Sequence, residues 1–291
     1  MKKKLAVIGK PGAWSTEHLS KKLETKNFEV SIFDAKEIHF NSELIRTSVS
    51  GVSLDSFDAV IIKKLGDYQP EIIDRLNLLQ LAEKRGVRFY SSPSELLRMI
   101  SRISCTTALL NHEVPMPNTF IGESAHQALE WLDNKKKVVF KPNFSTKAKG
   151  MQVLASSKVS LEDLTTLKKQ FGFLYLQKKL DIGDRDFGLA FIGDKFIGAY
   201  ARVASKSSWN TTTKDGGHYA ACELNDDIIA VAQKAKSAFN LDFCSVDIAI
   251  VDDKPLVFEV SAFGGFNGLL KGANIDAAEL LAQKISSDLN D

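Results

Sequence analysis

Residues 246–268 have the sequence VDIAIVDDKPLVFEVSAFGGFNG, and this stretch decides the fold of the second half of the chain. Two apolar runs flank a turn rich in Asp and Pro at 252–255, a pattern typical of a β-hairpin. Asp247 interrupts the first run, and Glu259 interrupts the second. Glu259 and Ser261 share one face of a strand because they are two residues apart, and the hairpin can bring Asp247 alongside them.

These three side chains predict a metal site. Two acids and a hydroxyl on one buried face are costly unless a cation joins them. A hard divalent cation meets that need, and Mg²⁺ commonly shares such a site with substrate phosphates. The alternative is a hairpin at a sheet edge whose acids reach solvent. Glycines in the tail GGFNG at 264–268 favour the metal, because they let backbone approach a ligand closely. The predicted ligands are Asp247, Glu259 and Ser261.

Length, charge and cysteine usage bound the possible functions. The 291 residues predict about two domains at roughly 150 residues each. The formal net charge is +2 and the basic clusters lack interleaved aromatic residues, so we expect neither nucleic acid nor a membrane as partner. The 3 cysteines are scattered without metal-ligand spacing, which predicts reduced thiols and a cytoplasmic protein. The sequence contains no apolar run of about 18 residues that would predict a membrane span.

The first 92 residues alternate predicted strands and helices. Such alternation implies a parallel sheet with helices on its faces, similar to a nucleotide-binding half-fold. The turn GKPG at 9–12 lacks the spacing of a phosphate-binding loop, so we expect an ordinary strand-to-helix turn. Ser15 or Thr16 is expected to cap the helix that follows. Strands are predicted at 5–8, 28–33, 57–63 and 87–90, and helices at 16–26 and 72–85.

Pro93 opens the next part of the chain, with Ser92 as the predicted cap of a helix over 94–110. Lys141 lies within an otherwise apolar strand, so it needs a partner. The polar loop NFSTKAKG at 143–150 joins two predicted strands. We predict that it is a flap whose Lys147 and Lys149 fold over phosphates; the alternative is an exposed hairpin loop.

The remaining segments supply a hinge, an arginine and a long loop. The turn KKLDIGDRD at 178–186 is a plausible hinge whose backbone could pair with an adenine edge. Arg202 lies among small and apolar residues and needs an anion, either a phosphate or, alternatively, Asp186 or Glu259. The polar loop around Trp209 is typical of functional loops. Further helices are predicted at 125–133, 161–171, 228–239 and 276–289.

With these elements placed, the chain resembles the ATP-grasp superfamily, and within it the RimK-type peptide and amino-acid ligases. The resemblance runs from about Pro93 to the end. It implies an α/β fold with α+β character in the C-terminal part. A Rossmann-like pre-ATP-grasp domain is expected at 1–92. An ATP-grasp fold of two α+β subdomains is expected at 93–175 and 176–291.

The resemblance also implies roles for individual residues. Asp247 with Glu259-Val260-Ser261 is similar to the family's acidic residue and Glu-x-Asn motif, which bind two Mg²⁺ ions against the ATP phosphates. Lys141 resembles a phosphate-contacting lysine, and Arg202 resembles the arginine that holds the transferred phosphate. Asp186 matches the Asp of an Asp-x-Arg element. The predicted nucleotide-binding residues are Arg102, Lys141, Lys147, Lys149, Gln177, Lys178, Leu180 and Asp186.

Several positions depart from the family pattern. Ser261 replaces the usual Asn, so a second metal would be held more weakly or through water. Gly188 stands where the family often has Arg, and Asn210 stands where it also often has Arg. Arg102 replaces an early phosphate lysine, which keeps the charge and changes the geometry. The stretches STKAKGM and SWNTTTKDGG resemble one bacterial branch, the ATP-grasp enzyme of the GAK gene system.

The activity implied by the resemblance is an ATP-dependent carboxylate–amine ligase that acts through an acyl phosphate. Its cofactors would be ATP and one or two Mg²⁺ ions, with Mn²⁺ as a substitute. Arg202, Asn210 and Lys214 are the predicted catalytic residues, the last two closing over the acceptor with Trp209. The partners would be a carboxylate and an amine, from an amino acid or a protein or peptide tail, and a homodimer or homotetramer is expected. Two alternatives are a non-catalytic or regulatory ATP-binding protein and a small-molecule kinase.

Overall fold

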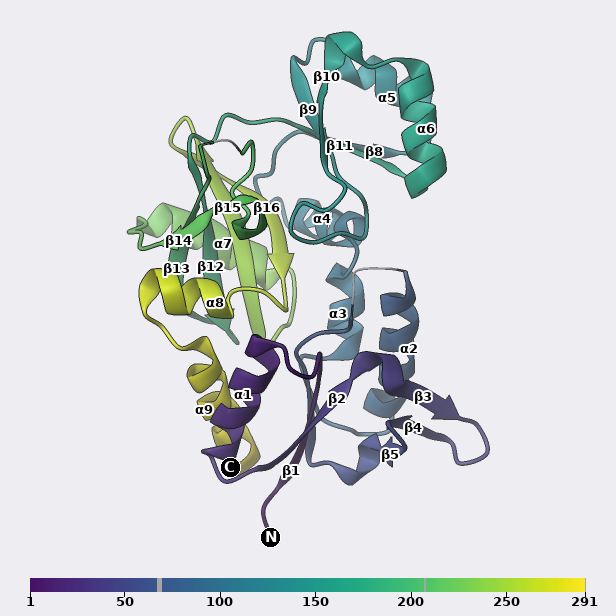
Figure 1. Cartoon of the computed structure of the whole chain (residues 1–291), viewed down its shortest axis with the longest axis vertical. Coiled ribbons are helices and arrows are strands. Elements are labelled where there is room, and N and C mark those ends of the chain that lie inside the picture. Colours follow the sequence, from purple (N-terminus) through teal and green to yellow (C-terminus); the bar gives the residue numbers. More distant parts are fainter. Residues whose placement is uncertain (67–69, 207, 291) are drawn as a thin grey trace.

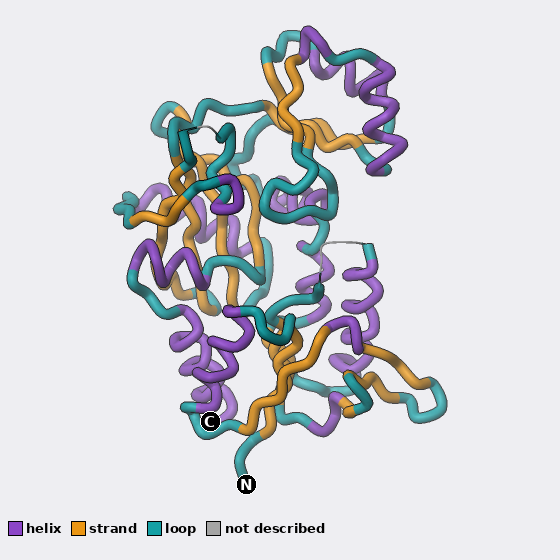
Figure 2. Tube along the Cα trace, in the orientation of Figure 1, coloured by secondary structure: helices purple, strands orange, loops and turns teal. Residues whose placement is uncertain are grey.

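The computed structural model describes residues 1–66, 70–206 and 208–290, and three main sheets follow one another along this part of the chain (Figure 1). The first sheet is parallel, and the other two are antiparallel. Helices pack against each of the three (Figure 2). This architecture confirms the predicted α/β fold with α+β character toward the C-terminus.

The first sheet has the strand order β2-β1-β6-β7, and alternate residues of β1 enter different cores. Ala6 and Ile8 belong to a buried cluster with residues of α2 (Glu71–Lys84). Leu5 and Val7 belong to a cluster with residues of α1 (Trp14–Glu24) and α9 (Ala277–Asn290). Helices therefore cover both faces, as the alternation of strands and helices predicts. The strands are β1 (Lys4–Gly9), β2 (Glu29–Asp34), β6 (Ala59–Ile62) and β7 (Phe89–Tyr90).

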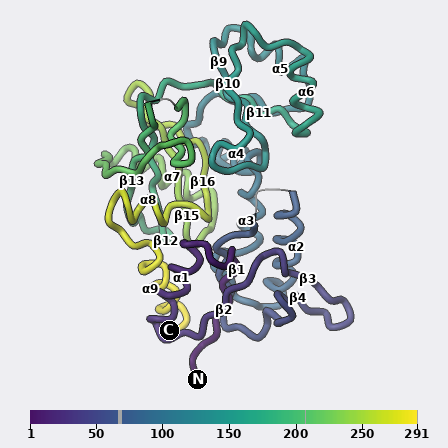
Figure 3. The backbone as a smooth tube through the Cα atoms, viewed as in Figure 1, coloured from purple at the N-terminus to yellow at the C-terminus, as the bar shows by residue number. Residues whose placement is uncertain are grey.

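Helix α9, at the end of the chain, packs against α1, near its start. His18 Nε2 lies 3.0 Å from Asp276 Oδ1, and Lys22 Nζ lies 3.1 Å from Asp276 Oδ2. The two ends of the chain lie close together (Figure 3), and the Lys3 ammonium contacts the Leu289 carbonyl. The first sheet is therefore completed by the last helix.

Helix α1 begins at Trp14, and the preceding Ala13 provides no side-chain cap. The prediction that Ser15 or Thr16 caps this helix is therefore wrong. The Gly12 N–H instead donates to Glu17 Oε1 at 2.8 Å. Because Glu17 accepts from the Gly12 N–H, that N–H is not free to bind a phosphate. This agrees with the prediction of an ordinary strand-to-helix turn.

One predicted helix is in fact two. Helix α3 (Pro93–Met99) begins after its cap Ser92, as predicted, and α4 (Arg102–Asn111) follows it. Between them Ser101 is extended, and its hydroxyl accepts from the Ser104 N–H at 3.0 Å. The prediction of a single helix over 94–110 is wrong because Ser101 provides a second N-cap. The break places Arg102 in the first turn of α4.

A small sheet with the order β3-β4-β5 lies against α2, where the sequence predicted no element. Its strands are short and mostly polar, so they lack the apolar alternation that marks a strand. The Thr47 hydroxyl donates to the Leu78 carbonyl at 3.0 Å and fixes the sheet to the helix. The strands are β3 (Ile38–Asn41), β4 (Arg46–Val49) and β5 (Val52–Ser53).

The second sheet has the order β10-β9-β11-β8 and carries two helices on one face. Strand β8 was not predicted, because it follows the extended segment around Pro115 and Pro117 directly. The loop 143–150 joins β9 to β10, as predicted. The elements are β8 (Thr119–Gly122), α5 (Ala125–Leu132), β9 (Lys137–Phe140), β10 (Gln152–Ala155), α6 (Leu161–Phe171) and β11 (Leu174–Lys178).

The third sheet has the order β14-β13-β12-β15-β16 and contains the predicted hairpin as β15 and β16. One face packs on α7 (Asp226–Ser237), and α8 (Phe266–Gly268) packs near β13. Among the described helices, none combines the length and the apolarity needed to cross a membrane. The strands are β12 (Arg185–Ile192), β13 (Lys195–Val203), β14 (His218–Ala220), β15 (Phe243–Val251) and β16 (Lys254–Ser261).

Candidate active site

A cavity of about 370 Å³ opens between the second and third sheets. The start of α4 and the loop after β9 contribute Arg102, Lys141 and Lys147. The end of β11 and the segment 179–183 that follows it line the cavity as well. The cavity therefore brings together residues from both antiparallel sheets. The third-sheet residues that line it are Asp186, Tyr200, Arg202, Tyr219, Ser245, Asp247, Phe258, Glu259 and Ser261.

A β-bulge in the last hairpin brings the two acids together. The hairpin turn at 252–253 has positive φ at both residues, 50° and 61°, as a tight two-residue turn requires. With that turn, unbroken pairing would set Asp247 opposite Phe258. The register instead shifts by one residue, so that Asp247 lies directly opposite Glu259. The extra residue Phe258 thus turns Glu259 onto the cavity face.

Arg202 lies between two carboxylates on this face. Its Nε and Nη2 donate to the two carboxylate oxygens of Asp186 at 2.9 and 2.8 Å, and Nη1 lies 2.9 Å from Asp247 Oδ2. Of the two predicted protein partners, Asp186 is therefore correct, whereas Glu259 pairs with another arginine. Burial lowers the pKa of Arg202, but Asp247 and Asp186 outweigh burial and hold that pKa well above its usual range. The guanidinium stays charged.

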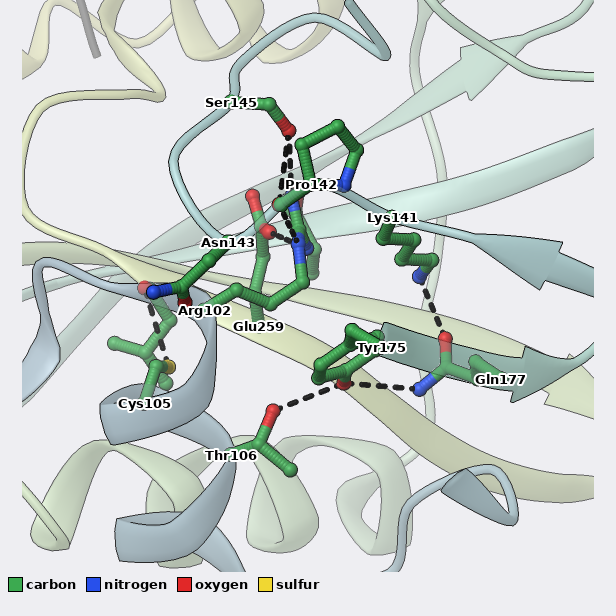
Figure 4. Close-up of polar contacts among 12 residues, drawn as sticks. Arg102, Cys105, Thr106, Lys141, Pro142, Asn143, Ser145, Tyr175, Gln177 and Glu259 are labelled. Carbon is green, nitrogen blue, oxygen red and sulfur yellow. Dashed lines mark hydrogen bonds and ion pairs between the residues drawn. The ribbon is translucent and has the colours of Figure 1, made fainter. Parts of the chain in front are cut away.

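Arg102 is the partner of Glu259 (Figure 4). Its Nη1 donates to Glu259 Oε2 at 2.9 Å, and its Nε donates to the Pro142 carbonyl at 3.2 Å. Burial raises the pKa of Glu259, but Arg102 and then Lys141 outweigh burial, so the pKa lies below its usual range. The Arg102 side chain is 6% exposed and that of Glu259 is 39% exposed, so the carboxylate stays open to the cavity.

Lys141 has a neutral partner. Its Nζ donates to Gln177 Oε1 at 2.6 Å (Figure 4). The Gln177 amide donates in turn to Thr119 Oγ1 at 3.0 Å. Burial, and next the nearby Arg102, lower the pKa of Lys141 to about 7. Its ammonium also lies 5.0 Å from the centre of the Phe258 ring. A buried cation without a bonded carboxylate is well prepared to receive an anion.

The donor set beside Arg202 fits a hard cation. Burial raises the pKa of Asp247 to about 7 against the opposing effect of Arg202, so this carboxylate lacks full compensation. The buried Oγ of Ser245, opposite Ser261, has no hydrogen-bond partner among the described residues. In the described part of the chain no three His, Cys, Asp or Glu side chains gather as a metal site. Two carboxylates and a hydroxyl fit Mg²⁺, which completes its shell with water and phosphate oxygens.

The loops place some predicted residues on the cavity and others away from it. Lys147, Lys178 and Leu180 line it. Lys149 and Lys214 are exposed and are not among the lining residues. Of the two lysines of the predicted flap, Lys147 therefore lines the cavity and Lys149 does not.

Asn210 lines the cavity, but its side chain is engaged within its own loop. Its Oδ1 accepts from the Thr212 N–H at 2.9 Å and from the Thr212 hydroxyl at 2.7 Å. Its Nδ2 donates to Asp215 Oδ2 at 2.9 Å. These bonds shape the loop and leave little of the amide free for a ligand.

Apart from Trp209, the sequence did not indicate the apolar and aromatic part of the lining. Phe258 was hidden because the bulge that turns it to the cavity has no sequence signal of its own. Tyr200 and Tyr219 contact each other edge to face with ring centres 5.4 Å apart. Strand alternation on β13 would have placed Tyr200 on the same face as Arg202. The missed lining residues include Val139, Met151, Ile182, Tyr200, Tyr219 and Phe258.

Comparison with protein families shows which family has this arrangement of residues. A model of the RimK-like ATP-grasp domain matches residues 100–285, well over half of the chain. The chain belongs to the RimK-like ATP-grasp family. The match covers α4, both antiparallel sheets and every residue predicted to bind nucleotide or metal.

Relatives of this RimK-like chain are found among both curated sequences and solved structures. It is 26% identical over 285 residues to the tetrahydromethanopterin:alpha-L-glutamate ligase of Methanococcus maripaludis, covering 96% of each chain. Human beta-citrylglutamate synthase B is 21% identical over 270 residues, 91% of this chain and 70% of that protein. D-cycloserine synthetase DcsG superposes with a TM-score of 0.77 at 17% identity, over 98% of this chain and 99% of that one.

The ATP-grasp ligase PsnB with its minimal precursor superposes with a TM-score of 0.76 at 17% identity, over 100% of this chain and 99% of that one. PsnB has also been solved with Mg and ADP. The predicted superfamily, its RimK type and the class of ATP-dependent carboxylate–amine ligase are confirmed. The narrower resemblance to the GAK-system branch, the domain boundaries and the roles of single residues stay predictions.

Proposed function

We propose that this RimK-like ligase joins a carboxylate to an amine through an acyl phosphate formed in the cavity between the second and third sheets. The carboxylate attacks the γ-phosphate of ATP and releases ADP. The amine then attacks the acyl carbon and releases phosphate. The observation that carries the proposal is the pairing of Asp247 with Glu259 on one cavity face, bonded to Arg202 and Arg102.

The hinge end of the cavity suits a nucleotide base. The backbone N–H groups of Lys178 and Lys179 donate to carbonyls of neighbouring segments at 2.8 and 3.1 Å. The first N–H beyond these two belongs to Leu180, which lines the cavity and would face the adenine edge. Apolar side chains suited to a flat ring line the same end: Val139, Met151 and Ile182.

The charged centre would hold the phosphates. Asp247, Glu259 and Ser261 would bind Mg²⁺, with the second of two ions held more weakly at Ser261 and Mn²⁺ as a substitute. When bound, the metal supplies positive charge that offsets the phosphate oxygens. Arg102 and Lys141 would bind the phosphate oxygens of the nucleotide, and Lys147 would approach them from the flap. Arg202, with Asp186 holding its guanidinium plane, would stabilise charge on the transferred phosphoryl group.

The acceptor would lie in the part of the cavity lined by Trp209, Tyr219 and Thr213, which is aromatic and hydroxyl-bearing. Arg202 pairs with Tyr219 across the neighbouring strands, and both of its terminal nitrogens and its Nε already bond to carboxylates. These features support an acceptor that is an amino acid or peptide with an uncharged side chain. The names of relatives, in contrast, include glutamate.

The test is a screen of amino acids, amino-acid amides and short peptides for ADP and phosphate formation with ATP and Mg²⁺. The expected result is equal release of ADP and phosphate, with a product lighter by one water than its two components. Acceptors with uncharged side chains should give more ADP and phosphate than glutamate does. Glu259→Gln should lower turnover by about 10³-fold, which abolishes it for practical purposes, while the protein stays folded.

Other outcomes of this screen would support the two alternatives. ADP without free phosphate would indicate a small-molecule kinase. Tight ATP binding without any ADP would indicate a non-catalytic ATP-binding protein. Unchanged turnover in Glu259→Gln would refute the metal assignment. Light scattering would test the expected homodimer or homotetramer, and the free thiols of Cys105, Cys222 and Cys244 support a cytoplasmic location.

A further inference from the structure

A buried lysine of the first sheet reaches the segment that follows the metal-binding strand. Lys63 directly follows β6, and its backbone N–H donates to the Ile8 carbonyl at 2.8 Å. The residue is 4% exposed. In the described residues it forms no ion pair with a carboxylate. A buried lysine without a carboxylate must be stabilised by weaker interactions, such as hydrogen bonds to carbonyls and contacts with aromatic rings. The groups that make these interactions show which segment the lysine holds in place.

Both partners of the Lys63 ammonium lie just after Ser261. Its Nζ donates to the Phe263 carbonyl at 2.8 Å, and it lies 4.2 Å from the centre of the Phe266 ring. Phe266 is itself fixed, because its ring packs edge to face on Phe243 at 4.9 Å. A desolvated ammonium over an aromatic face is a favourable contact. Lys63 therefore binds two points on either side of Gly264 and Gly265.

The Phe263 peptide connects this contact to the cavity. The Phe263 N–H donates to Ser261 Oγ at 3.4 Å, while its carbonyl accepts from Lys63. Gly264 and Gly265 line the cavity, and Gly265 has a φ of 92° that favours glycine. Ala262 and Phe263 pack on the core. The two glycines have no side chains to pack, so their conformation depends on bonds that hold the neighbouring residues. Lys63 supplies one of them from the first sheet.

We propose that Lys63 is a positioning residue that holds the 262–265 segment, and through it the Ser261 hydroxyl, in the geometry that binds the metal–nucleotide complex. This inference rests on the proposed function, because it assigns Ser261 to the metal. It adds a coupling between the first sheet and the site, although no residue of the first sheet lines the cavity in the described part of the chain. Lys63 does not itself touch the nucleotide.

The experiment compares ADP affinity with and without Mg²⁺ by calorimetry. In Lys63→Met, which keeps the length of the side chain and loses its charge and donors, the gain in ADP affinity due to Mg²⁺ should fall about fivefold. Metal-free ADP affinity should stay within about twofold of the wild type, because the hinge and Lys141 are untouched. Lys64→Met, the adjacent lysine, is the matched control and should behave as the wild type.

Lys63→Arg provides a second measurement, which serves if Lys63→Met fails to fold as judged by circular dichroism. Arginine keeps the charge and changes the donor geometry. The gain in ADP affinity due to Mg²⁺ in Lys63→Arg should therefore lie between the gains of the wild type and of Lys63→Met. An unchanged effect of Mg²⁺ in the folded Lys63 variants would overturn the inference alone. Equal losses of metal-free and metal-bound affinity would also overturn it, because they indicate a general structural role. Wild-type ADP binding that ignores Mg²⁺ would overturn the proposed metal site as well.

Discussion

The sheet wall and the loop wall of the cavity hold their charged side chains in different ways. On the third sheet, Arg202 makes three contacts with Asp186 and Asp247, each of 2.9 Å or less. In the loops, Lys147 and Lys179 line the cavity without any ion pair in the described part of the chain. The sheet charges are therefore in place before a ligand binds, whereas the loop charges gain partners from the ligand. Changes on the sheet should affect folding and catalysis, and changes in the loops should affect affinity alone.

The largest effect is expected for Arg202→Met. The change leaves Asp186 and Asp247 buried without their cation, which should lower the free energy of unfolding by about 3–5 kcal/mol. Turnover should fall by about 100-fold, more than nucleotide affinity, because the arginine is proposed to act on the transferred group. Urea unfolding and steady-state kinetics measure the two effects.

Arg185→Met is the matched control for Arg202. Arg185 begins the same pair of strands, but it is exposed and bonds to its neighbour Asp184 at 2.8 Å. We expect no measurable loss of stability or turnover from this variant. Equal effects of the two substitutions, or a loss at Arg202 confined to affinity, would contradict the distinction between sheet and loop charges.

Lys141→Met tests a residue between the two classes, buried like the sheet charges but without a bonded carboxylate. ATP affinity should fall about tenfold, ~1.4 kcal/mol, because a charge-assisted bond to phosphate is lost. Equilibrium binding of ATP measures this effect. Unchanged affinity would show that the buried ammonium serves only its bond to Gln177.

The pH dependence of stability in the same variant gives an independent result. Burial lowers the pKa of Lys141 from 10.5 to about 7, so between these values the unfolded chain binds a proton that the folded chain does not. The free energy of unfolding of the wild type relative to Lys141→Met should therefore rise from about pH 7 toward pH 10, by at most ~1.4 kcal/mol per pH unit. Urea unfolding at several pH values measures this difference. A difference that stays flat or falls would show that Lys141 is charged in the free protein.

The smallest effect is expected in the flap. Lys147 lines the cavity and Lys149 does not, although both are lysines of one loop. Lys147→Ala should raise the KM for ATP roughly threefold, as an exposed charge contact allows, and Lys149→Ala should leave the KM unchanged. The folding stability of both variants should match the wild type. A larger effect of Lys149→Ala would mean that the flap closes with the other lysine inside.

Strand alternation was enough to place Glu259 and Ser261 on one face, because that pattern depends only on the period of a strand. The hairpin also placed Asp247 nearby. Its exact partner depends on the bulge at Phe258, which adds one residue through local backbone geometry that apolar patterning does not encode. The sequence therefore predicted the members of the acid pair, and the structure supplied their register.

Contacts between distant segments were beyond the reach of sequence patterns. Arg102 reaches Glu259 because Ser101 begins a new helix there, and the sequence around Ser101 also suits a continuous helix. The contact of Lys63 with Phe263 joins segments 200 residues apart. Local periodicity describes which face a side chain occupies, but it contains no information on which other element meets that face.

The packing of α9 on α1 and the first sheet has a consequence for how the protein forms in the cell. A ribosome releases the N-terminal strands long before it releases residues 277–290, so Leu5 and Val7 lack their full cover until that helix has emerged. The nascent N-terminal half would be a natural client for chaperones during that interval. Shortening the chain by its last helix should make the first sheet prone to aggregate, even though that helix is far in sequence from every strand it protects.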